Sequence, residues 1–193
     1  MKTVAIIPAR GGSTRIPRKN IRDFRGKPII AYSIAAARDS GLFDQVIVST
    51  EDREIAEIAQ AYNADVILRP AELADNETGT QEVMRHAMGV VQGADIGCCI
   101  YPTAPMMGQG DLYLGLCAIN NGSIYAFTVG TEPALHDAGQ FYWGKAWAFR
   151  GGAPLISMRT AMIPIDANRD CDINTEADWL RAEIMYDKLT GRA

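Results

Sequence analysis

The sequence lacks the features that mark membrane proteins and nucleic-acid-binding proteins. None of its hydrophobic runs is long enough to span a bilayer, and the apolar start is interrupted too early, at Pro8, for a signal peptide. The net charge of -4 argues against a general nucleic-acid-binding surface. We therefore expect a cytoplasmic protein that has neither a membrane nor a nucleic acid as its partner.

Histidine and cysteine are also scarce. The 2 histidines, His86 and His136, lie near no plausible nucleophile, which argues against a Ser-His-Asp or Cys-His hydrolase. The 4 cysteines have neither the paired spacing of a metal knuckle nor that of a disulfide framework. Cys98 and Cys99 are adjacent in an apolar run, where the alternation of a strand would send them to opposite faces. Buried free thiols in a reducing cytoplasm are the expectation.

Beyond these absences, short β-rich runs alternate with longer helix-like segments along the 193 residues. Strands are predicted at residues 3–9, 44–50, 64–69, 95–101, 123–129, 140–144 and 161–165, and helices at residues 27–41, 51–63, 80–92 and 176–190. This alternation predicts βαβ units, and hence an α/β fold with a mostly parallel sheet and helices on both faces. No linker or repeat divides the chain, so we expect a single domain over residues 1–193.

A basic loop follows the first predicted strand, in the stretch VAIIPARGGSTRIPRKN (residues 4–20). Gly11 and Gly12 allow backbone N–H groups to approach an anion, and Ser13 and Thr14 add hydroxyl donors, although neither the P-loop nor G-x-G-x-x-G is matched. In an open α/β sheet, ligands bind at the carboxyl ends of the strands. The loop is therefore a candidate polyphosphate site; the alternative is a solvated loop whose cations pair with nearby carboxylates. Its cations are Arg10, Arg15, Arg18 and Lys19.

The segment IIPARGGSTRIPRKNI closely resembles the N-terminal signature of the CMP-sialic acid synthetase family, the acylneuraminate cytidylyltransferases. Similar segments follow in the same order over nearly the whole chain: GKPIIAYSI, GLFDQVIVST, ILRPAELADNETGT, CCIYPTAP, HDAGQFYW and DINTEADWLRAE. CCIYPTAP and HDAGQFYW are most similar to the branch of the family that uses pseudaminic acid. The resemblance implies a Rossmann-like nucleotide-diphospho-sugar transferase fold.

Members of this family transfer CMP from CTP to the anomeric hydroxyl of a nine-carbon 2-keto sugar acid and release pyrophosphate. The resemblance thus implies a Mg²⁺-dependent cytidylyltransferase whose partners are CTP and a keto-sugar acid, with Arg10, Lys19 and Asp172 as catalytic residues. Arg69 would read the cytosine edge, and the alternative is an arginine in a surface turn before Pro70. The implied CTP site comprises Ala9, Arg10, Gly11, Gly12, Ser13, Lys19, Asn20, Arg69, Thr78 and Thr80.

The resemblance also implies a sugar pocket and a metal site. The stretch DCDIN would carry Mg²⁺ on alternating oxygen ligands at one side of an extended backbone. An EF-hand is excluded because Thr175 and Arg181 replace its Gly and Glu, and the alternative is that Asn174 or Thr175 caps the last helix, a role compatible with ligation. His136 by itself also fits a structural hydrogen-bonding role. The metal ligands would be Asp170, Asp172 and Asn174, and the sugar pocket would comprise Tyr101, Thr103, His136, Asp137, Gln140 and Tyr142.

Three departures from the family pattern bear on activity. Thr14 stands where Lys is common, and Asn174 stands where a second Asp is usual. The chain is also short between AFTVG and TEPALHDAGQFYW, where relatives carry an arm that helps to form the dimer, which weakens the expectation of a homodimer. Two alternatives therefore stay open: a cytidylyltransferase for another keto-sugar acid, such as an eight-carbon one, and a CTP-binding homologue with little or no catalysis.

Overall fold

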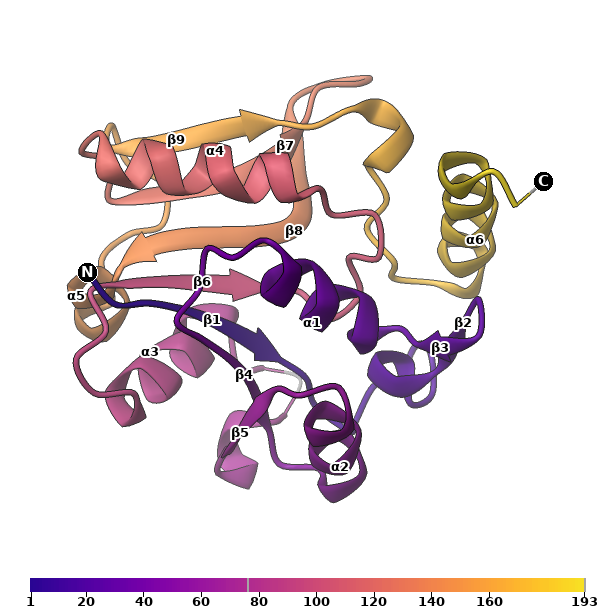
Figure 1. Cartoon of the computed structure of the whole chain (residues 1–193), viewed down its shortest axis with the longest axis horizontal. Coiled ribbons are helices and arrows are strands. Elements are labelled where there is room, and N and C mark those ends of the chain that lie inside the picture. The colour runs from indigo at the N-terminus through magenta and orange to yellow at the C-terminus, as the bar shows by residue number, and fades with distance from the viewer. Residues whose placement is uncertain (76, 193) are drawn as a thin grey trace.

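The computed structural model describes residues 1–75 and 77–192; Asn76, which belongs to the motif ILRPAELADNETGT, and Ala193, the last residue of the predicted domain, lie outside the described residues. A seven-stranded sheet runs through the molecule, and a two-stranded hairpin lies beside it (Figure 1). The strands are β1 (Thr3–Pro8), β2 (Asp23–Phe24), β3 (Lys27–Pro28), β4 (Gln45–Thr50), β5 (Asp65–Leu68), β6 (Ile96–Ile100), β7 (Tyr125–Gly130), β8 (His136–Lys145) and β9 (Thr160–Pro164). The α-helices are α1 (Ile30–Asp39), α2 (Arg53–Ala61), α3 (Thr80–Val90), α4 (Gln109–Asn120), α5 (Ala146–Gly151) and α6 (Glu176–Thr190), and short 3-10 helices are η1 (Lys19–Ile21), η2 (Ala71–Leu73) and η3 (Ala167–Arg169).

The order of the strands in the large sheet is β5-β4-β1-β6-β8-β7-β9. Among the described strands of this sheet, β8 alone is antiparallel to its neighbours. The chain passes from β1 outward to β4 and β5, and then returns to place β6 on the other side of β1. The strand order therefore reverses between β1 and β6, and the crevice at their carboxyl ends is where such folds bind ligands. The predicted α/β fold with a mostly parallel sheet is confirmed.

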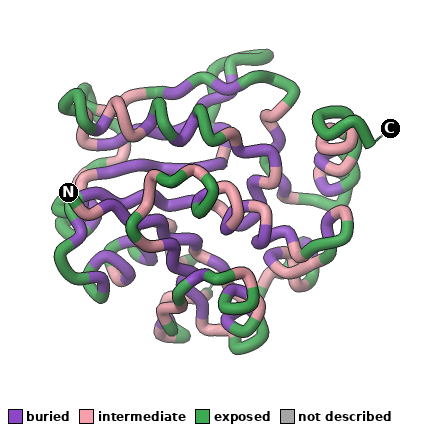
Figure 2. The backbone as a smooth tube through the Cα atoms, in the orientation of Figure 1, coloured by how far each residue is buried: buried purple, intermediate pink, exposed green. Residues whose placement is uncertain are grey.

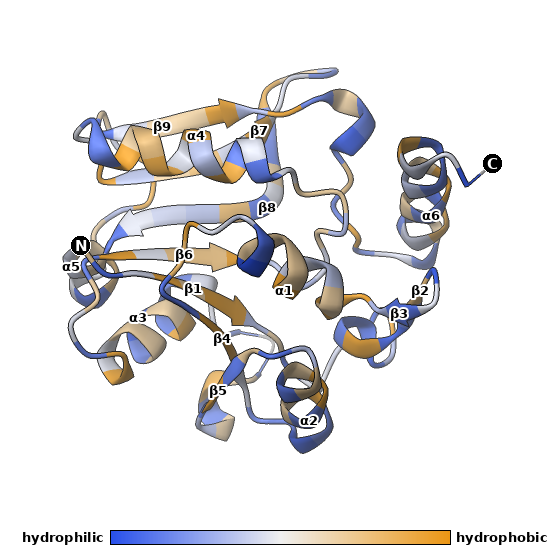
Figure 3. Cartoon of the chain, viewed as in Figure 1, coloured by the Kyte–Doolittle hydropathy of each residue, from blue (hydrophilic) through white to orange (hydrophobic). Residues whose placement is uncertain are grey.

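Alternating side chains of the central strands build two hydrophobic cores, one on each face of the sheet. Ala5 and Ile7 of β1 belong to the core that α1, α2 and α4 cover, whereas Val4 and Ile6 belong to the core that α3 and α5 cover. The buried backbone lies mainly along the central strands (Figure 2), where hydrophobic residues are also concentrated (Figure 3). Burying one such aliphatic side chain stabilises the fold by about 1.5–3 kcal/mol. Within the described residues, no helix has both the length and the apolarity needed to cross a bilayer.

The two adjacent cysteines follow the same alternation. Cys98 lies in one core and Cys99 in the other, and both are free thiols with no exposed surface. Burial raises the pKa of both thiols well above its ordinary value, so they remain neutral. The prediction of buried thiols on opposite faces of a strand is confirmed for this pair, and Cys171 is also buried, whereas Cys117 is only half-buried.

A third, smaller hydrophobic cluster joins α6 to the beginning of the chain, beside the β2–β3 hairpin (Figure 1). Trp179 of α6 packs edge-on against Phe24 of the hairpin, with ring centroids 5.6 Å apart. Ile16 of the basic loop is fully buried in the same cluster. Arg25 of the hairpin pairs with Asp187 of α6 at 2.6 Å. The last helix of the chain is thereby fixed against the loop that follows the first strand.

The structure corrects the predicted start of the first helix. The sequence predicts a helix over residues 27–41 with a proline in its first turn, but residues 27 and 28 form β3 and α1 begins at Ile30. Arg25 and Gly26 have φ values of 51° and 91°, which suits the two-residue turn of a hairpin. Pairing with β2 therefore overrides the local helix pattern.

Helices α4 and α5 are missing from the sequence-based prediction. Gly110 and Gly115 lower the helix propensity of the α4 segment. Gly115 allows α4 to pack closely on β8, because a Cβ there would lie 2.7 Å from Nε1 of Trp143 and 3.0 Å from the ring of Phe141. The contact with β8 thus explains why α4 contains Gly115, the residue that weakens its helix pattern in the sequence. Strand β8 also begins before the predicted residues 140–144, since its first residues pair with the end of β7 beyond a bulge.

Thr175 caps α6, as one of the sequence-based alternatives predicts. Its Oγ1 accepts a hydrogen bond from the N–H of Asp178 at 3.2 Å, and its own N–H donates to the Asp178 carboxylate at 2.7 Å. We expect Thr175→Ala to lower the free energy of unfolding by about 1 kcal/mol, measured by urea denaturation, because a helix N–H loses its acceptor. Thr190→Ala, at the other end of α6, is the matched control. An equal loss in both variants would contradict the capping assignment.

Candidate active site

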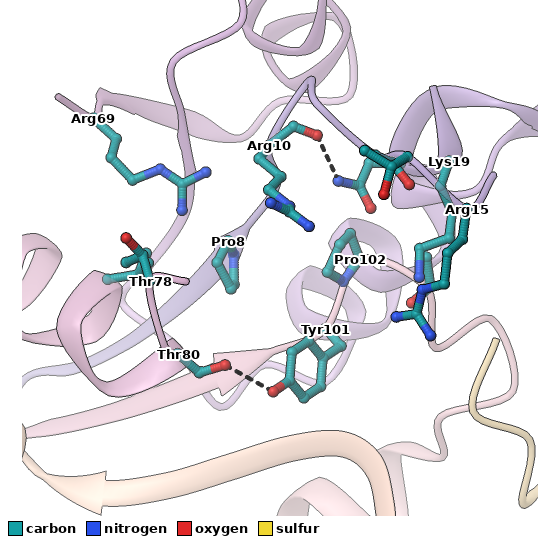
Figure 4. Close-up of a pocket in the computed structure, with 14 residues that line it drawn as sticks. Pro8, Arg10, Arg15, Lys19, Arg69, Thr78, Thr80, Tyr101 and Pro102 are labelled. Atoms are coloured by element: carbon teal, nitrogen blue, oxygen red, sulfur yellow. Dashed lines mark hydrogen bonds between the residues drawn. The ribbon is translucent and has the colours of Figure 1, made fainter. Parts of the chain in front are cut away.

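A hollow opens at the carboxyl ends of β1 and β6, where the strand order reverses (Figure 4). The basic loop forms one wall, the residues after β6 form another, and the turn from β5 into α3 forms the third. Of the predicted CTP-binding residues, the hollow gathers Arg10, Ser13, Lys19, Asn20, Arg69, Thr78 and Thr80. Its other lining residues are Pro8, Thr14, Arg15, Val83, Tyr101, Pro102 and Thr103.

Four cations line this hollow, and none of the described residues in its lining is acidic. Lys19 Nζ donates to the carbonyl oxygen of Ile173 at 2.7 Å, and Arg10 Nη1 donates to the carbonyl oxygen of Asp75 at 2.5 Å. Burial lowers the pKa of Lys19, while the neighbouring Asp172 acts in the opposite direction. Carbonyl partners orient the two side chains without neutralising their charge. The hollow therefore favours a ligand with several negative charges.

Arg69 is buried at the opposite side of the hollow from Lys19, with Arg10 between them (Figure 4). Its side chain is 3% exposed, and its Nη2 pairs with a carboxylate oxygen of Glu51 at 3.0 Å. Its Nε finds no hydrogen-bond partner among the described residues. An unsatisfied buried donor of this kind costs about 1–3 kcal/mol. The alternative of an arginine in a surface turn is wrong.

The backbone of the basic loop contributes less to the hollow than the sequence predicts. The N–H of Gly11 donates to Glu51 Oε1 at 2.7 Å, and it is therefore committed to a carboxylate instead of facing the hollow. Ala9 is fully buried in a core cluster and its N–H donates to the carbonyl oxygen of Ser49 at 2.9 Å. Gly12 also lies outside the lining of the hollow. The side chains of the loop, not these three backbone positions, face the ligand space.

Arg18 is likewise directed away from the hollow. It pairs with Asp52 at 2.5 Å and with Glu54 at 2.6 Å. The Arg18 hydrogen bond holds the pKa of Asp52 below its usual value, and the same carboxylate caps α2 by accepting from the N–H of Ile55 at 3.0 Å. The alternative of cations paired with nearby carboxylates is thus correct for this one arginine. Its ion pairs anchor the end of the loop to α2.

A second hollow adjoins the first and shares Lys19, Tyr101 and Thr103 with it. Tyr142 donates a hydrogen bond to Asp137, and the hydroxyls of Tyr101 and Thr80 lie 2.8 Å apart. Burial raises the pKa of Tyr101 to about 12, and it raises that of Tyr142 as well, so both phenols keep their protons at neutral pH. The predicted sugar residues gathered here are Tyr101, Thr103, Asp137 and Tyr142, together with Gly139, Asp172 and Asn174.

Two predicted sugar residues and one predicted metal ligand lie outside this second hollow. His136 Nε2 pairs with Asp170 Oδ2 at 2.9 Å, and Asp170 lines a different hollow beside Arg181. Gln140 is 3% exposed and its Nε2 donates to the carbonyl oxygen of Arg169 at 2.9 Å. The structure therefore does not bring Asp170 together with Asp172, because the turn of η3 and the pairing with His136 direct it elsewhere.

Asp172 and Asn174 do lie together, as the sequence predicts. The Asn174 amide donates to Asp172 Oδ2 at 2.5 Å, which leaves the amide oxygen and the other carboxylate oxygen available. No cluster of three or more His, Cys, Asp or Glu side chains suited to a metal occurs in the part of the chain that the structure describes. A Mg²⁺ site built from one or two protein oxygens, with substrate phosphates as further ligands, fits this donor set.

Glu51 and Asp52 are the residues that the sequence-based prediction missed at this site. They directly follow β4, which is the neighbour of β1 in the sheet. Because the carboxyl ends of parallel neighbours meet at one edge, an acidic pair at this position is expected to reach the loop after β1. The acidic dipeptide at the end of this predicted strand is the feature of the sequence from which the contact with the loop could have been predicted.

Comparison with known proteins places this geometry in a family. A family model described as Cytidylyltransferase matches residues 4–134, which is more than half of the chain. The chain is 34% identical over 228 residues to the pseudaminic acid cytidylyltransferase of Campylobacter jejuni, covering 96% of this chain and 97% of that protein. That alignment is longer than the 193 residues present here, so parts of the relative have no counterpart in this chain. An N-acylneuraminate cytidylyltransferase of Escherichia coli is 39% identical over 104 residues, covering 54% of this chain and 25% of that protein.

Solved structures agree on the fold. The structure of a CMP:2-keto-3-deoxy-manno-octonic acid synthetase complexed with CTP matches 98% of this chain and 100% of its own with a TM-score of 0.80, at 19% identity. A 4-diphosphocytidyl-2C-methyl-D-erythritol synthase from Anaerococcus prevotii matches 96% of this chain and 98% of its own with a TM-score of 0.73, at 10% identity. At these identities the likeness establishes the fold, which is the nucleotidyltransferase α/β fold predicted from the sequence.

The two adjacent glycines of the loop give a direct test of its anchoring. A Cβ on Gly11 would lie 3.0 Å from both Cβ and Cγ of Asp52, and closer to one carboxylate oxygen, whereas a Cβ on Gly12 would meet nothing within 4 Å. We expect Gly11→Ala to lower the free energy of unfolding by about 1–3 kcal/mol, because Asp52 must leave its partners. Thermal or urea denaturation measures the loss. Gly12→Ala is the matched control, and a loss of stability as large as that of Gly11→Ala would contradict this packing.

Proposed function

This chain belongs to the cytidylyltransferase family, and from that premise we propose that it transfers CMP from CTP to the anomeric hydroxyl of a nine-carbon 2-keto sugar acid of the pseudaminic type. The observation that carries the proposal is the hollow at the β1/β6 switch point, lined by four cations and by no described carboxylate. A triphosphate supplies the charge that this hollow lacks. The identity of 34% to a pseudaminic acid cytidylyltransferase over nearly the full length of both chains supports the acceptor class.

The residues of the first hollow take the CTP. Arg10, Ser13, Lys19 and Asn20 bind the triphosphate, and Arg69, Thr78 and Thr80 hold the base at the other side. The anomeric oxygen of the acceptor attacks the α-phosphorus and loses its proton, and the bond between that phosphorus and the bridging oxygen breaks as pyrophosphate leaves. Fixed positive charge stabilises both the α-phosphate during attack and the departing pyrophosphate.

The second hollow takes the sugar acid. It adjoins the phosphate site through Lys19, Tyr101 and Thr103, so an acceptor bound there reaches the α-phosphate. Tyr142 and Asp137, already hydrogen-bonded to each other, present a donor and an acceptor to sugar hydroxyl or amide groups. His136 and Gln140 are not part of this proposal, because neither lines this hollow.

Asp172 and the amide oxygen of Asn174, which line the second hollow together with Lys19, would hold Mg²⁺ there. When bound, the ion neutralises charge on the phosphate oxygens. Asp172 also acts on the neighbouring Lys19, because its charge favours the protonated amine that burial disfavours. Asp170 is not part of this proposal, because it pairs with His136 elsewhere.

A second candidate function is CTP binding with little turnover. It is favoured by Asn174, an amide in place of a second carboxylate, whose N–H₂ group already donates to Asp172. It is also favoured by the short connection at residues 131–135, between β7 and β8, where relatives of this family are expected to carry an arm. Because this connection is short, a homodimer formed through such an arm is not part of the proposal.

Pyrophosphate release from CTP and Mg²⁺ tests the proposed function, with pseudaminic acid, N-acetylneuraminic acid and an eight-carbon keto acid as parallel acceptors. We expect release that depends on the acceptor and is fastest with pseudaminic acid. If release were fastest with either of the other acceptors, the proposed acceptor would be wrong, but the proposed CMP transfer would stand. CTP binding by calorimetry without release in any arm would establish the second candidate function instead.

Asp172→Asn tests the metal assignment. We expect it to lower turnover roughly 100-fold or more, because a charge that organises the metal and the phosphates is lost, while CTP binding without Mg²⁺ is retained. Asp166→Asn is the matched control, since Asp166 caps η3 outside both hollows and accepts from the N–H of Asn168 at 2.8 Å. Normal turnover of Asp172→Asn would remove this carboxylate from the mechanism.

A further inference from the structure

Glu51 joins two parts of the nucleotide site that the sequence keeps apart. One of its carboxylate oxygens accepts from the N–H of Gly11 at 2.7 Å, and the other pairs with Arg69 Nη2 at 3.0 Å. Gly11 belongs to the loop whose side chains face the phosphate end of the hollow, whereas Arg69 lies at the far side (Figure 4). A single carboxylate therefore contacts residues at both ends of the hollow, the phosphate loop at one end and Arg69 at the other.

The contact with Glu51 also fixes the orientation of the Arg69 guanidinium. This group is planar, and its side chain is 3% exposed, so an anchor at Nη2 determines where the remaining N–H groups point. Its Nε is buried and has no partner among the described residues. The backbone N–H of Arg69 is itself held by the carbonyl oxygen of Thr50 at 2.9 Å, directly before Glu51. The result is a rigidly held guanidinium at one side of the hollow.

A rigid arginine distinguishes pyrimidine bases by their hydrogen-bonding pattern. Arginine donates and never accepts, and cytosine offers acceptors at both O2 and N3. Uracil carries a proton at N3, so the same donor pair would face another donor and leave a buried N–H unsatisfied. Discrimination of this kind depends on the donors staying in place, because a mobile guanidinium could turn to meet O2 or O4 of uracil alone.

We propose that Glu51 is the positioning residue for base selection: it holds Arg69 in the orientation that accepts cytosine and rejects uracil, and it ties that orientation to the phosphate loop through Gly11. This inference rests on the proposed CTP site and goes beyond it, because Glu51 itself does not line the hollow. Glu51 acts on the nucleotide through Arg69, not by touching it.

Glu51→Gln tests the inference with the shape of the side chain preserved. Calorimetry with CTP and with UTP, in the absence of an acceptor, measures the affinity of each nucleotide. We expect CTP affinity to fall roughly ten- to hundredfold, since a charge-assisted contact to a buried arginine is lost, and UTP affinity to change much less. The preference for CTP over UTP should therefore collapse. Glu54→Gln removes an equal charge beside the same loop, outside the hollow, and should leave the preference unchanged.

The double variant separates positioning from a merely structural role. In an Arg69→Gln background, Glu51→Gln should change the ratio of CTP to UTP affinity by less than about twofold, because the residue through which it acts is gone. Independent, additive losses in the two single variants would overturn the proposal. Tighter CTP binding by Glu51→Gln would overturn it as well. Glu51 would then compete with the CTP phosphates for the N–H of Gly11.

The same measurements distinguish this inference from the proposed function. A wild-type protein that binds neither nucleotide would refute the CTP site, and the role of Glu51 with it. A wild-type protein that prefers CTP, together with a folded Glu51→Gln variant that keeps the full preference, would refute only the role of Glu51. Circular dichroism and a thermal melt establish that the variant is folded, and Glu51→Asp, which keeps the charge and shortens the reach, should lose part of the preference.

Discussion

Positive charge gathered around one hollow, with no described carboxylate in its lining, is the constraint on which the rest of this structure depends. Like charges repel, and burial of some of them makes the arrangement more costly. The protein supports the cations of this region through several kinds of contact. Carbonyl oxygens orient Arg10 and Lys19, a carboxylate behind the hollow holds Arg69, and Arg18 is drawn out to Asp52. The charge that remains is directed at a ligand.

The C-terminal helix α6 helps to position these charges, although it packs in a third hydrophobic cluster and not on either core of the main sheet. Ile173, which accepts from Lys19, is fully buried in the cluster that Trp179 and Ile16 also occupy. Asp172 precedes it and lines the second hollow. The packing of α6 on the β2–β3 hairpin therefore sets the position of a cation and an anion of the site at the same time. Residues from both ends of the chain meet because this cluster joins them.

Local patterns were sufficient for much of the fold. Short β-rich runs that alternate with helix-like segments predict a mostly parallel α/β sheet, and Asn174 or Thr175 is the predicted cap of the last helix. Prediction was wrong where a tertiary contact outweighs local preference. Gly115 weakens the local helix pattern of α4, and its small size is required by Trp143 of β8, on which α4 packs. Strand β3 replaces the first turn of a predicted helix because it pairs with β2.

The sequence by itself determined which chemical groups are present: a basic loop after the first strand, motifs in the order typical of the family, and oxygen-bearing side chains before the last helix. Only the tertiary structure decided which of these groups act together. It placed Arg69 and Glu51 in contact across the sheet edge, committed the Gly11 N–H to that carboxylate, and separated Asp170 from Asp172. The physical reason is that residue type fixes what a group can bind, whereas burial and neighbours from distant segments fix where it points and whether its charge is free.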